Sequence, residues 1–441
     1  MSTYREVDPT LTPAHHDLKD RVHAFARDVL RPAATTLDRM ADPADVIARG
    51  SPLWDALGTA YAAGFHTALV PREAGGMGLS GLALHVALEE LGWGSADFAA
   101  ALACAGFPFV YAAMRGDPAL IEEFVRPFVA DTRAEMVGCW AITEPGHGSD
   151  QFMVSTPQFF DAAISGDVTA RPDGDAYVLR GSKAPWVSNG TIATHALVYL
   201  TVDPSRGLAG GGVALVPLGL PGVSKAPPLD KLGQRALNQG TIVFDDVRIP
   251  RRYVLFGPDA YEAVLRQTLA LTNAAMGAIF TGVARAAYEE ALAHCRTRVQ
   301  GGTRLCEHQL VQKHLFDMFT KVQTARHLSR AAFVYNENRA EPALEHAVAA
   351  KVYCTQAAYE VCDTAVQLFG GRGLAKGYLV EKLYRDARAS LIEDGSNDVL
   401  SLMGARAILA SGFPHESETP SVPSTPPSLP PARERAEPAS V

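Results

Sequence analysis

The sequence predicts an α+β protein in which a β domain lies between two helical domains. The first observation behind this prediction is hydrophobic periodicity. Apolar residues recur every three or four positions before about residue 138 and after about residue 253, and they alternate in between. The second is length, because 441 residues allow two or three domains. We therefore expect a helical domain over residues 1–138, a β domain over residues 139–252 and a second helical domain over residues 253–410.

The N-terminal part shows helical spacing from about His15 to Thr132. The spacing is clearest in DLKDRVHAFARDVL and in ALHVALEELGW, where charged residues separate the apolar positions. The loop from Val70 to Gly81 contains a proline and several glycines, which interrupt helices. This part is predicted to be helical with one irregular connection.

The middle part changes to short runs rich in β-branched and aromatic residues. These runs are AYVLRG, THALVYLTV, GGVALVPL and GTIVFDDVRIP. Turn sequences at residues 172–174 and 210–212 separate them. The pattern predicts a β domain inserted between helices.

Helical spacing returns after Tyr261 and continues to about Leu409, as in EHAVAAKVYCTQAAYEVCDTAVQLF. Residues 411–441 are rich in proline and poor in apolar side chains, so they cannot bury enough surface to fold. We predict a disordered tail there.

The composition excludes several classes of function. With 47% hydrophobic and 20% charged residues, the chain is typical of a soluble globular protein. A net charge of −8 argues against a nucleic-acid partner, which needs a basic face. No signal sequence and no run of roughly 18 apolar residues is present, and the six cysteines show no metal-binding spacing. We expect a cytoplasmic protein with no membrane partner and no metal.

The most informative local feature is the pair of carboxylates Glu393 and Asp394 in front of Gly395 and Ser396. A carboxylate before a Gly-Ser turn can project into a cleft, where burial adjusts its pKa for taking a proton from a weak carbon acid. The alternative is structural, with Asp394 capping the helix that starts near Asn397. The pair alone leaves both interpretations open.

Two runs in the β domain combine small, hydroxyl-bearing and aromatic residues. AITEPGHGSD, residues 141–150, contains Thr143 and Ser149, which can approach a flat ring and bond to a ligand. GSKAPWVSNG, residues 181–190, contains Trp186 and Ser188. Either run alone is also compatible with a turn beside the core.

Two runs in the C-terminal part contain an arginine or a glycine-rich turn. RVQGGTRLCEHQ, residues 298–309, begins with an arginine, whose guanidinium matches phosphate oxygens with paired hydrogen bonds. AVQLFGGRG, residues 365–373, is followed by VEKLYRDAR, residues 380–388. A Gly-Gly-x-Gly turn is a weak signal alone, because many helices end on such turns.

In this order and at these spacings, the runs resemble the acyl-CoA dehydrogenase family from about Leu18 to Leu409. The resemblance implies a middle β-barrel or sandwich, a C-terminal four-helix bundle and noncovalently bound FAD. It also implies that Trp186 packs beside the flavin ring and that Ser188 hydrogen-bonds near its N5. Further cofactor contacts are implied for Thr143, Ser149, Arg298, Gln309, Gln367, Gly370, Gly371, Ser396 and Asp398.

The same resemblance implies an oligomer. In the family, the residues matching Arg298 and Gln309 reach the FAD diphosphate of a neighbouring subunit, so we expect a homo-oligomer, either a dimer or a tetramer. Gly301 stands where the family usually has an aromatic residue, which leaves one adenosine-side contact in question.

Asp394 falls on the position of the family's usual catalytic Glu. There the carboxylate removes the α-proton of an acyl thioester while hydride leaves the β-carbon for flavin N5. Asp is shorter than Glu by one methylene, about 1.5 Å. Some members hold their Glu at a position matching Thr272, which cannot act as a base, so Asp394 is the candidate and Glu393 the second one.

Further departures indicate an unusual substrate. Asn273 replaces a family Arg, and Glu393 replaces an aromatic residue that often precedes the catalytic Glu. Glu393 either pairs with an amine or another polar group of the substrate or faces solvent. The stretch from Asp150 to Lys183 is longer than in typical members and is expected to shape the thioester entrance, the alternative being a surface excursion without function.

Three functions follow from the resemblance. The favoured one is FAD-dependent α,β-dehydrogenation of an acyl thioester on CoA or a carrier protein, with an electron-transfer flavoprotein or oxygen as acceptor. The second is a flavin oxidase or monooxygenase of specialised metabolism. The third is a catalytically weakened partner subunit of a mixed oligomer. Arginine outnumbers lysine, which fits a bacterial genome rich in GC.

Overall fold

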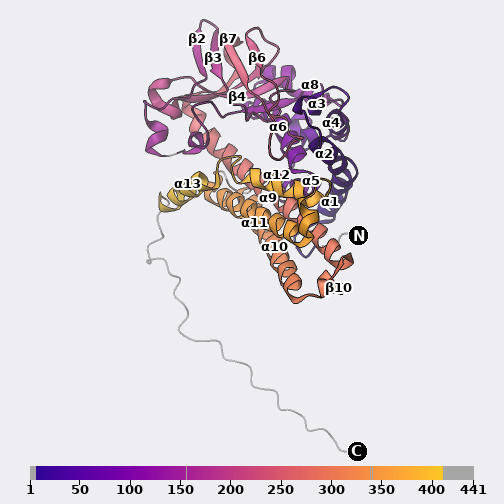
Figure 1. Cartoon of the computed structure of the whole chain (residues 1–441). Coiled ribbons are helices and arrows are strands. Elements are labelled where there is room, and N and C mark those ends of the chain that lie inside the picture. The colour runs from indigo at the N-terminus through magenta and orange to yellow at the C-terminus, as the bar shows by residue number, and fades with distance from the viewer. Residues whose placement is uncertain (1–5, 155, 338, 340, 411–441) are drawn as a thin grey trace, which may run out of the picture.

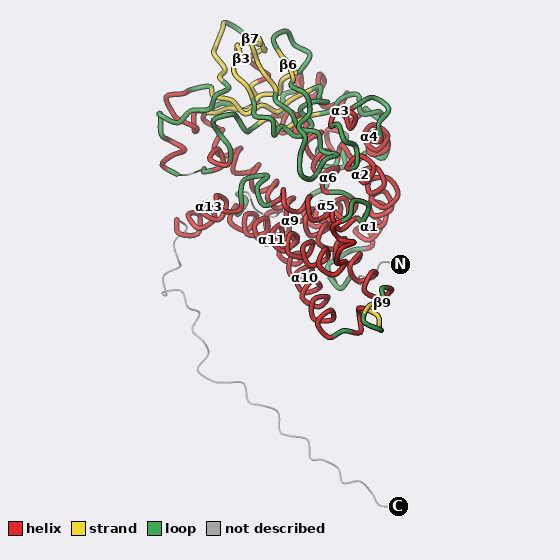
Figure 2. Tube along the Cα trace, viewed as in Figure 1, coloured by secondary structure: helices red, strands yellow, loops and turns green. Residues whose placement is uncertain are grey.

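The computed structural model describes residues 6–154, 156–337, 339 and 341–410. The predicted disordered tail, residues 411–441, lies outside the described residues. The described chain forms a helical N-terminal part, a curled sheet and a C-terminal helical bundle (Figure 1). The strands of the main sheet gather at one end of the molecule, the short β9 strand lies at the opposite end, and helices make up most of the rest, which confirms the α+β class (Figure 2).

The N-terminal part is helical, and its longest helices are α5 and α6. Ser95 separates them because it is extended, and its hydroxyl accepts a hydrogen bond from the Phe98 backbone N–H at the start of α6. The helices are α1 (Pro13–Phe25), α2 (Arg31–Asp38), α3 (Pro43–Ile47), α4 (Pro52–Ala62), α5 (Gly81–Gly94), α6 (Ala96–Arg115), α7 (Pro118–Leu120) and α8 (Arg126–Ala130).

The middle part is an eight-stranded sheet with the order β6-β7-β3-β2-β4-β5-β8, in which β1 also pairs with β4. The β1–β4 pair is parallel, and β4 and β5 are antiparallel and almost entirely buried. The strands are β1 (Gly138–Ala141), β2 (Thr169–Asp173), β3 (Ala176–Ser182), β4 (His195–Thr201), β5 (Gly211–Pro217), β6 (Val223–Lys225), β7 (Ile242–Pro250) and β8 (Val254–Phe256).

The C-terminal part is a bundle built around the 40-residue helix α9. Its helices are α9 (Pro258–Thr297), α10 (Gln309–Glu337), α11 (Leu344–Phe369), α12 (Leu379–Ser390) and α13 (Asn397–Ala410). A small hairpin, β9 (Val299–Gln300) and β10 (Thr303–Arg304), connects α9 to α10. Gly301 and Gly302 form its turn with φ of 66° and 86°, a conformation in which an aromatic residue would be strained.

Helices α5 and α9 cross at very short range. A Cβ atom on Gly92 would lie 2.1 Å from the backbone oxygen of Ile279, and one on Gly282 would lie 2.1 Å from that of Glu89. Glycine at both positions is therefore required for this crossing. The crossing joins the N-terminal part to the bundle and fixes one wall of the cavity described below.

Two helices, α6 and α9, are long and apolar enough to span a membrane. The most apolar stretch is 78% buried inside the protein in α6 and 89% buried in α9, as expected for core helices.

Candidate active site

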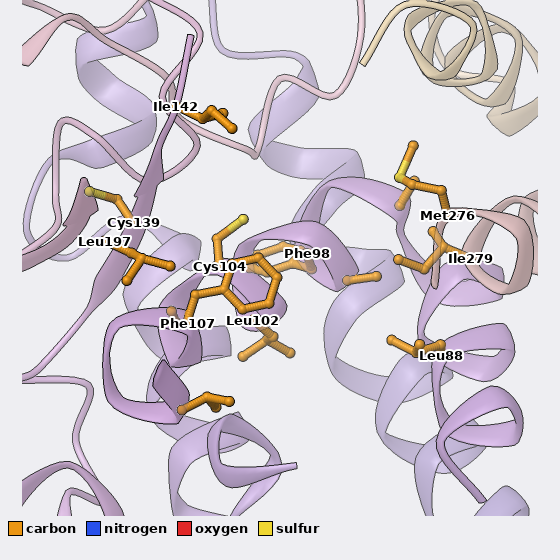
Figure 3. Packing of buried hydrophobic residues seen from close by; sticks show 14 of the residues in the cluster. Leu88, Phe98, Leu102, Cys104, Phe107, Cys139, Ile142, Leu197, Met276 and Ile279 are labelled. Atoms are coloured by element: carbon orange, nitrogen blue, oxygen red, sulfur yellow. The ribbon is translucent and has the colours of Figure 1, made fainter. Parts of the chain in front are cut away.

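A cavity of about 770 Å³ lies where the N-terminal helices, the sheet and the bundle meet. One side is apolar, and Figure 3 shows Leu88, Phe107, Met276 and Ile279 together in this packing. The apolar lining comes mainly from three helices: Leu84, Leu88 and Leu91 of α5, Ala99, Ala103 and Phe107 of α6, and Leu271, Met276 and Ile279 of α9. Such a lining suits a hydrocarbon group.

The cavity lining also includes the two carboxylates predicted from the sequence. The chain leaves α12 at Ser390, turns through Glu393 and Asp394 and enters α13 at Asn397. Asp394 and Gly395 both have positive φ, 56° and 92°, and a Cβ on Gly395 would lie 3.1 Å from the ring of Phe152. This tight turn directs the chain so that both carboxylates line the cavity.

The helix cap proposed as the alternative role of Asp394 is provided by Ser396 instead. The Ser396 hydroxyl accepts a hydrogen bond from the backbone N–H of Val399, in the first turn of α13, at 3.3 Å. No hydrogen bond from any described residue reaches the Asp394 carboxylate. Its left-handed backbone and its unpaired oxygens are features of a functional residue rather than of a cap.

The environment of Asp394 suits a base that works near neutral pH. Burial raises the pKa of its carboxyl to about 6, and the nearby Lys351 opposes the rise. The Lys351 ammonium donates to the Gly395 carbonyl and to Asn397 Oδ1, each at 2.7 Å, so it is held beneath the turn. Burial lowers the pKa of Lys351 to about 8.

Glu393 is fixed from one side only. Its Oε1 accepts a hydrogen bond from Gln234 Nε2 at 2.6 Å. Burial raises the pKa of Glu393 to about 7, with Gln234 opposing and the Asp394 charge adding to the rise. Glu393 therefore lines the cavity, which favours the first of the two alternatives left open for this side chain by the sequence.

Four residues predicted to contact a flavin line the same cavity: Thr143, Ser149, Trp186 and Ser188. Trp186 is 56% exposed, which is unusual for a tryptophan and leaves a ring face free for stacking. Ser149 Oγ accepts a hydrogen bond from the backbone N–H of Ser396 at 3.0 Å, which joins the sheet to the carboxylate turn. Hydroxyls and an open aromatic face fit a flat, polar ring such as a flavin.

The other predicted cofactor residues do not line this cavity. Arg298 and Gln309 flank the β9–β10 hairpin, at the opposite end of the molecule from the sheet (Figure 1). The end of α11 and the turn after it contain Gln367, Gly370 and Gly371. Phe369 stacks on His294 with ring centroids 4.0 Å apart, so this end of α11 lies beside the end of α9. Asp398 is exposed in the first turn of α13.

This distant group is positively charged. Burial lowers the pKa of His294, and the charges of Arg372 and Arg298 lower it further. Arg298 and its neighbours lie far from the cavity of their own subunit (Figure 1). This position suits the expected contact with a cofactor bound in a neighbouring subunit. That contact stays a prediction.

The inserted stretch after Asp150 is partly buried. Its 3-10 turns, Ser149–Phe152 and Pro157–Phe160, pack Phe159 against Tyr261 and bring Phe152 to the cavity. At least its first turn therefore contributes to the cavity wall, as the entrance hypothesis requires.

Sequence reasoning did not single out several cavity residues. Gln234 and Lys231 line the cavity from the loop between β6 and β7. In the sequence, this loop is marked only by Gly233, which indicates a turn but not a site. Arg388 of α12 also lines the cavity, and its Nη1 has no hydrogen-bond partner among the described residues. Thr272 and Asn273 were both singled out in the sequence. Thr272 lines the cavity, and its hydroxyl has no hydrogen-bond partner among the described residues, whereas Asn273 is fully buried and does not line the cavity.

Among the described residues, one cluster of side chains that could bind a metal occurs outside the cavity, formed by Glu144, His147 and Asp167. Its ligand atoms are already engaged. Glu144 pairs with Lys183 at 2.6 Å, and His147 hydrogen-bonds to Asp150 Oδ2 at 2.6 Å. We assign no metal to it.

Models of three acyl-CoA dehydrogenase domains match this chain in order: the N-terminal domain over residues 12–132, the middle domain over residues 139–247 and the C-terminal domain over residues 263–409. The chain is 30% identical over 412 residues to the mitochondrial short-chain specific acyl-CoA dehydrogenase of Rattus norvegicus, covering 93% of each.

Two solved structures are similar over most of their length. Butyryl-CoA dehydrogenase from Megasphaera elsdenii has a TM-score of 0.79 at 27% identity, with 91% of this chain and 100% of that one covered. Nitroalkane oxidase crystallised with 1-nitrohexane has a TM-score of 0.81 at 25% identity, with 91% and 97% covered.

Proposed function

This chain belongs to the acyl-CoA dehydrogenase family of flavoprotein oxidoreductases, and from this premise we propose that it oxidises the Cα–Cβ bond of an acyl thioester with FAD bound and Asp394 as the base. The observation that carries the proposal is the Asp394 carboxylate. It lines the cavity without a hydrogen bond from a described residue, beside Thr143, Ser149 and Trp186. CoA or a carrier protein is the handle of the thioester.

The bond changes are simple. FAD, when bound, supplies the acceptor for the hydride that leaves Cβ. Asp394 takes the α-proton on a carboxylate oxygen, and the electron pair of the broken Cα–H bond becomes the α,β double bond. A pKa of about 6 keeps this carboxylate ionised at neutral pH and still basic enough to accept the proton.

The proposed cofactor contacts form two sets. Thr143, Ser149, Trp186 and Ser188 hold the flavin ring at the cavity, and Ser396 lies next to them, since its backbone N–H donates to Ser149 Oγ. Arg298 and Gln309 bind the diphosphate of the neighbouring subunit's FAD, Gln367, Gly370 and Gly371 line the dinucleotide, and Asp398 lies at the edge of the site. A homo-oligomer, dimer or tetramer, is therefore part of the proposal, as are an electron-transfer flavoprotein as acceptor and a cytoplasmic location.

Anaerobic mixing of the yellow holoprotein with butyryl-CoA tests this function. We expect the flavin absorbance to bleach, with a rate that rises with pH and reaches half of its plateau near pH 6, because only the ionised Asp394 accepts a proton. At pH 5 the rate should be about tenfold below the plateau. Bleaching by no acyl thioester, or a rate independent of pH between 5 and 8, would contradict the proposal.

The cross-subunit contact gives a separate prediction. Arg298→Ala should lower flavin occupancy and weaken the oligomer together, since one side chain serves both. Flavin content per chain and the mass in solution measure the two effects. Arg304→Ala, a change on the neighbouring strand of the same hairpin, is the control and should leave both intact. Full flavin content in Arg298→Ala would refute the assignment.

A second candidate function is the oxidation of another carbon acid with oxygen as acceptor. The likeness to nitroalkane oxidase and the aspartate at the base position favour it. The same holoprotein distinguishes the two functions. Bleaching by a primary nitroalkane and release of hydrogen peroxide in air support the oxidase, and bleaching by acyl-CoA without rapid reaction with oxygen supports the dehydrogenase. A colourless protein that no FAD restores would instead support the catalytically weakened subunit.

A further inference from the structure

Glu393 places a polar group on the wall of a cavity that has one side suited to hydrocarbon. Its Oε1 is held by Gln234 at 2.6 Å, whereas Oε2 receives no hydrogen bond from a described residue. Apolar side chains of α5, α6 and α9 line one side of this space. A methyl-ended acyl chain would leave Oε2 without a partner, an arrangement that sites avoid when they bind their own substrate.

Gln234 is built to hold Glu393 in place. It is 2% exposed and adopts φ of 48°, a left-handed conformation unusual outside glycine. Its backbone N–H donates to Asp386 Oδ1 at 2.5 Å, and its side-chain Nε2 reaches the Asp386 carbonyl at 3.3 Å as well as Glu393. The preceding Gly233 lies against α12, where a Cβ would be 2.4 Å from the Arg385 backbone oxygen. A strained, fully supported side chain of this kind is typical of a functional site.

The surrounding charge favours a neutral partner for Glu393. Lys351 and Lys231 already interact with this carboxyl electrostatically. Lys231 is itself held by the Leu237 carbonyl at 2.7 Å and by Gln239 Oε1 at 2.9 Å. A substrate ammonium would compete with these cations and would lose its water among apolar side chains, which is costly. A hydroxyl or amide N–H makes the same hydrogen bond at a smaller desolvation cost.

We propose that Glu393, positioned by Gln234, is a specificity-determining residue that selects acyl thioesters bearing a neutral hydrogen-bond donor, such as a hydroxyl, on the acyl chain. This inference rests on the proposed dehydrogenase function. It assigns Glu393 to substrate recognition and leaves proton removal to Asp394.

The test compares substrates that differ only at the end of the acyl chain. Anaerobic flavin reduction is measured for ω-hydroxyacyl-CoA thioesters of five to eight carbons and for straight acyl-CoA thioesters one carbon longer, in which a methyl replaces the hydroxyl. We expect the holoenzyme to prefer the hydroxyl form at its best length by at least about tenfold in the ratio of rate to dissociation constant. An ω-aminoacyl-CoA should be poorer than the hydroxyl form.

Two variants locate the preference. Glu393→Leu should lower it by at least about tenfold, improving the methyl-ended substrate and weakening the hydroxylated one. Gln234→Asn keeps a residue that tolerates positive φ but withdraws the amide from Glu393, so it should lower the preference as well. Gln356→Asn, the same change on the exposed face of α11, should leave it unchanged.

The outcomes separate the two proposals. Equal rates for both substrate types at every length, or the same preference in the wild type and in both variants, would overturn the role of Glu393 while leaving the dehydrogenase intact. A preference for the ammonium form would overturn the neutral-donor assignment. Failure of every thioester to reduce the flavin would instead refute the proposed function itself.

Discussion

Asp394→Asn should keep the fold and the bound flavin but slow reduction by a good acyl thioester by about a thousandfold. A positioned general base contributes about 10² to 10⁴ in rate, and the amide cannot accept the α-proton. Stopped-flow bleaching under anaerobic conditions measures the effect directly. Substrate affinity should change little, because Asp394 acts on the reacting C–H bond rather than on the thioester handle.

Two neighbouring variants make this prediction specific. Asp394→Glu should retain more activity than Asp394→Asn, because the side chain faces a cavity and has room to lengthen. The longer carboxylate shifts the basic oxygen by about 1.5 Å, so a loss of up to about a hundredfold is compatible with its role. Glu393→Gln should still bleach, since its amide can remain beside Gln234. Normal turnover by Asp394→Asn together with a dead Glu393→Gln would transfer the base to Glu393.

The order of the helical and β parts could be predicted from the sequence, because the hydrophobic period of a helix or strand is set by residues close together in the chain. A local hydrophobic period marks each element by itself, in helices such as α9 and α11 and in strands such as β3 and β7. Thr143, Ser149, Trp186 and Ser188 were found through motif spacing, and the structure brings them to one cavity with Asp394.

The position of Glu393 could not be predicted in the same way. Consecutive residues in a turn can point in opposite directions, and only the positive φ of Asp394 and the contact with Gln234 decide the direction here. Gln234 lies 159 residues away in the chain, so no local pattern pairs it with Glu393. Likewise, Ser396 rather than Asp394 caps α13, a choice that depends on the backbone path through Gly395.

Long-range charge pairing was also missed. Glu89 and Glu90 have the spacing of surface residues in the sequence, yet both are buried at the crossing of α5 and α9. Arg285 of α9 donates to Glu89 Oε1 at 2.9 Å and to Glu90 Oε1 at 2.8 Å. Arg326 of α10 binds the other side of Glu89, with Nε 3.0 Å from Oε2. This network connects the N-terminal part to the bundle.

Arg285→Leu should therefore destabilise the protein strongly, by about 3 to 5 kcal/mol, because it leaves the buried Glu90 carboxylate without its main partner. Arg285 is 2% exposed, so water cannot replace the lost hydrogen bonds. The shift of the denaturant midpoint of the holoprotein, at an unchanged slope, measures the loss.

Arg126→Leu is the matched control for that loss, since Arg126 pairs with Glu122 at 2.6 Å on the exposed surface. Its effect should stay below about 1 kcal/mol, because solvent screens exposed pairs.

Adding Glu90→Leu to Arg285→Leu should recover part of the stability, because an apolar pair is less costly to bury than a lone carboxylate. If the double variant is as unstable as the sum of its single variants, the two residues do not stabilise each other and the buried network is not what holds α5 against α9.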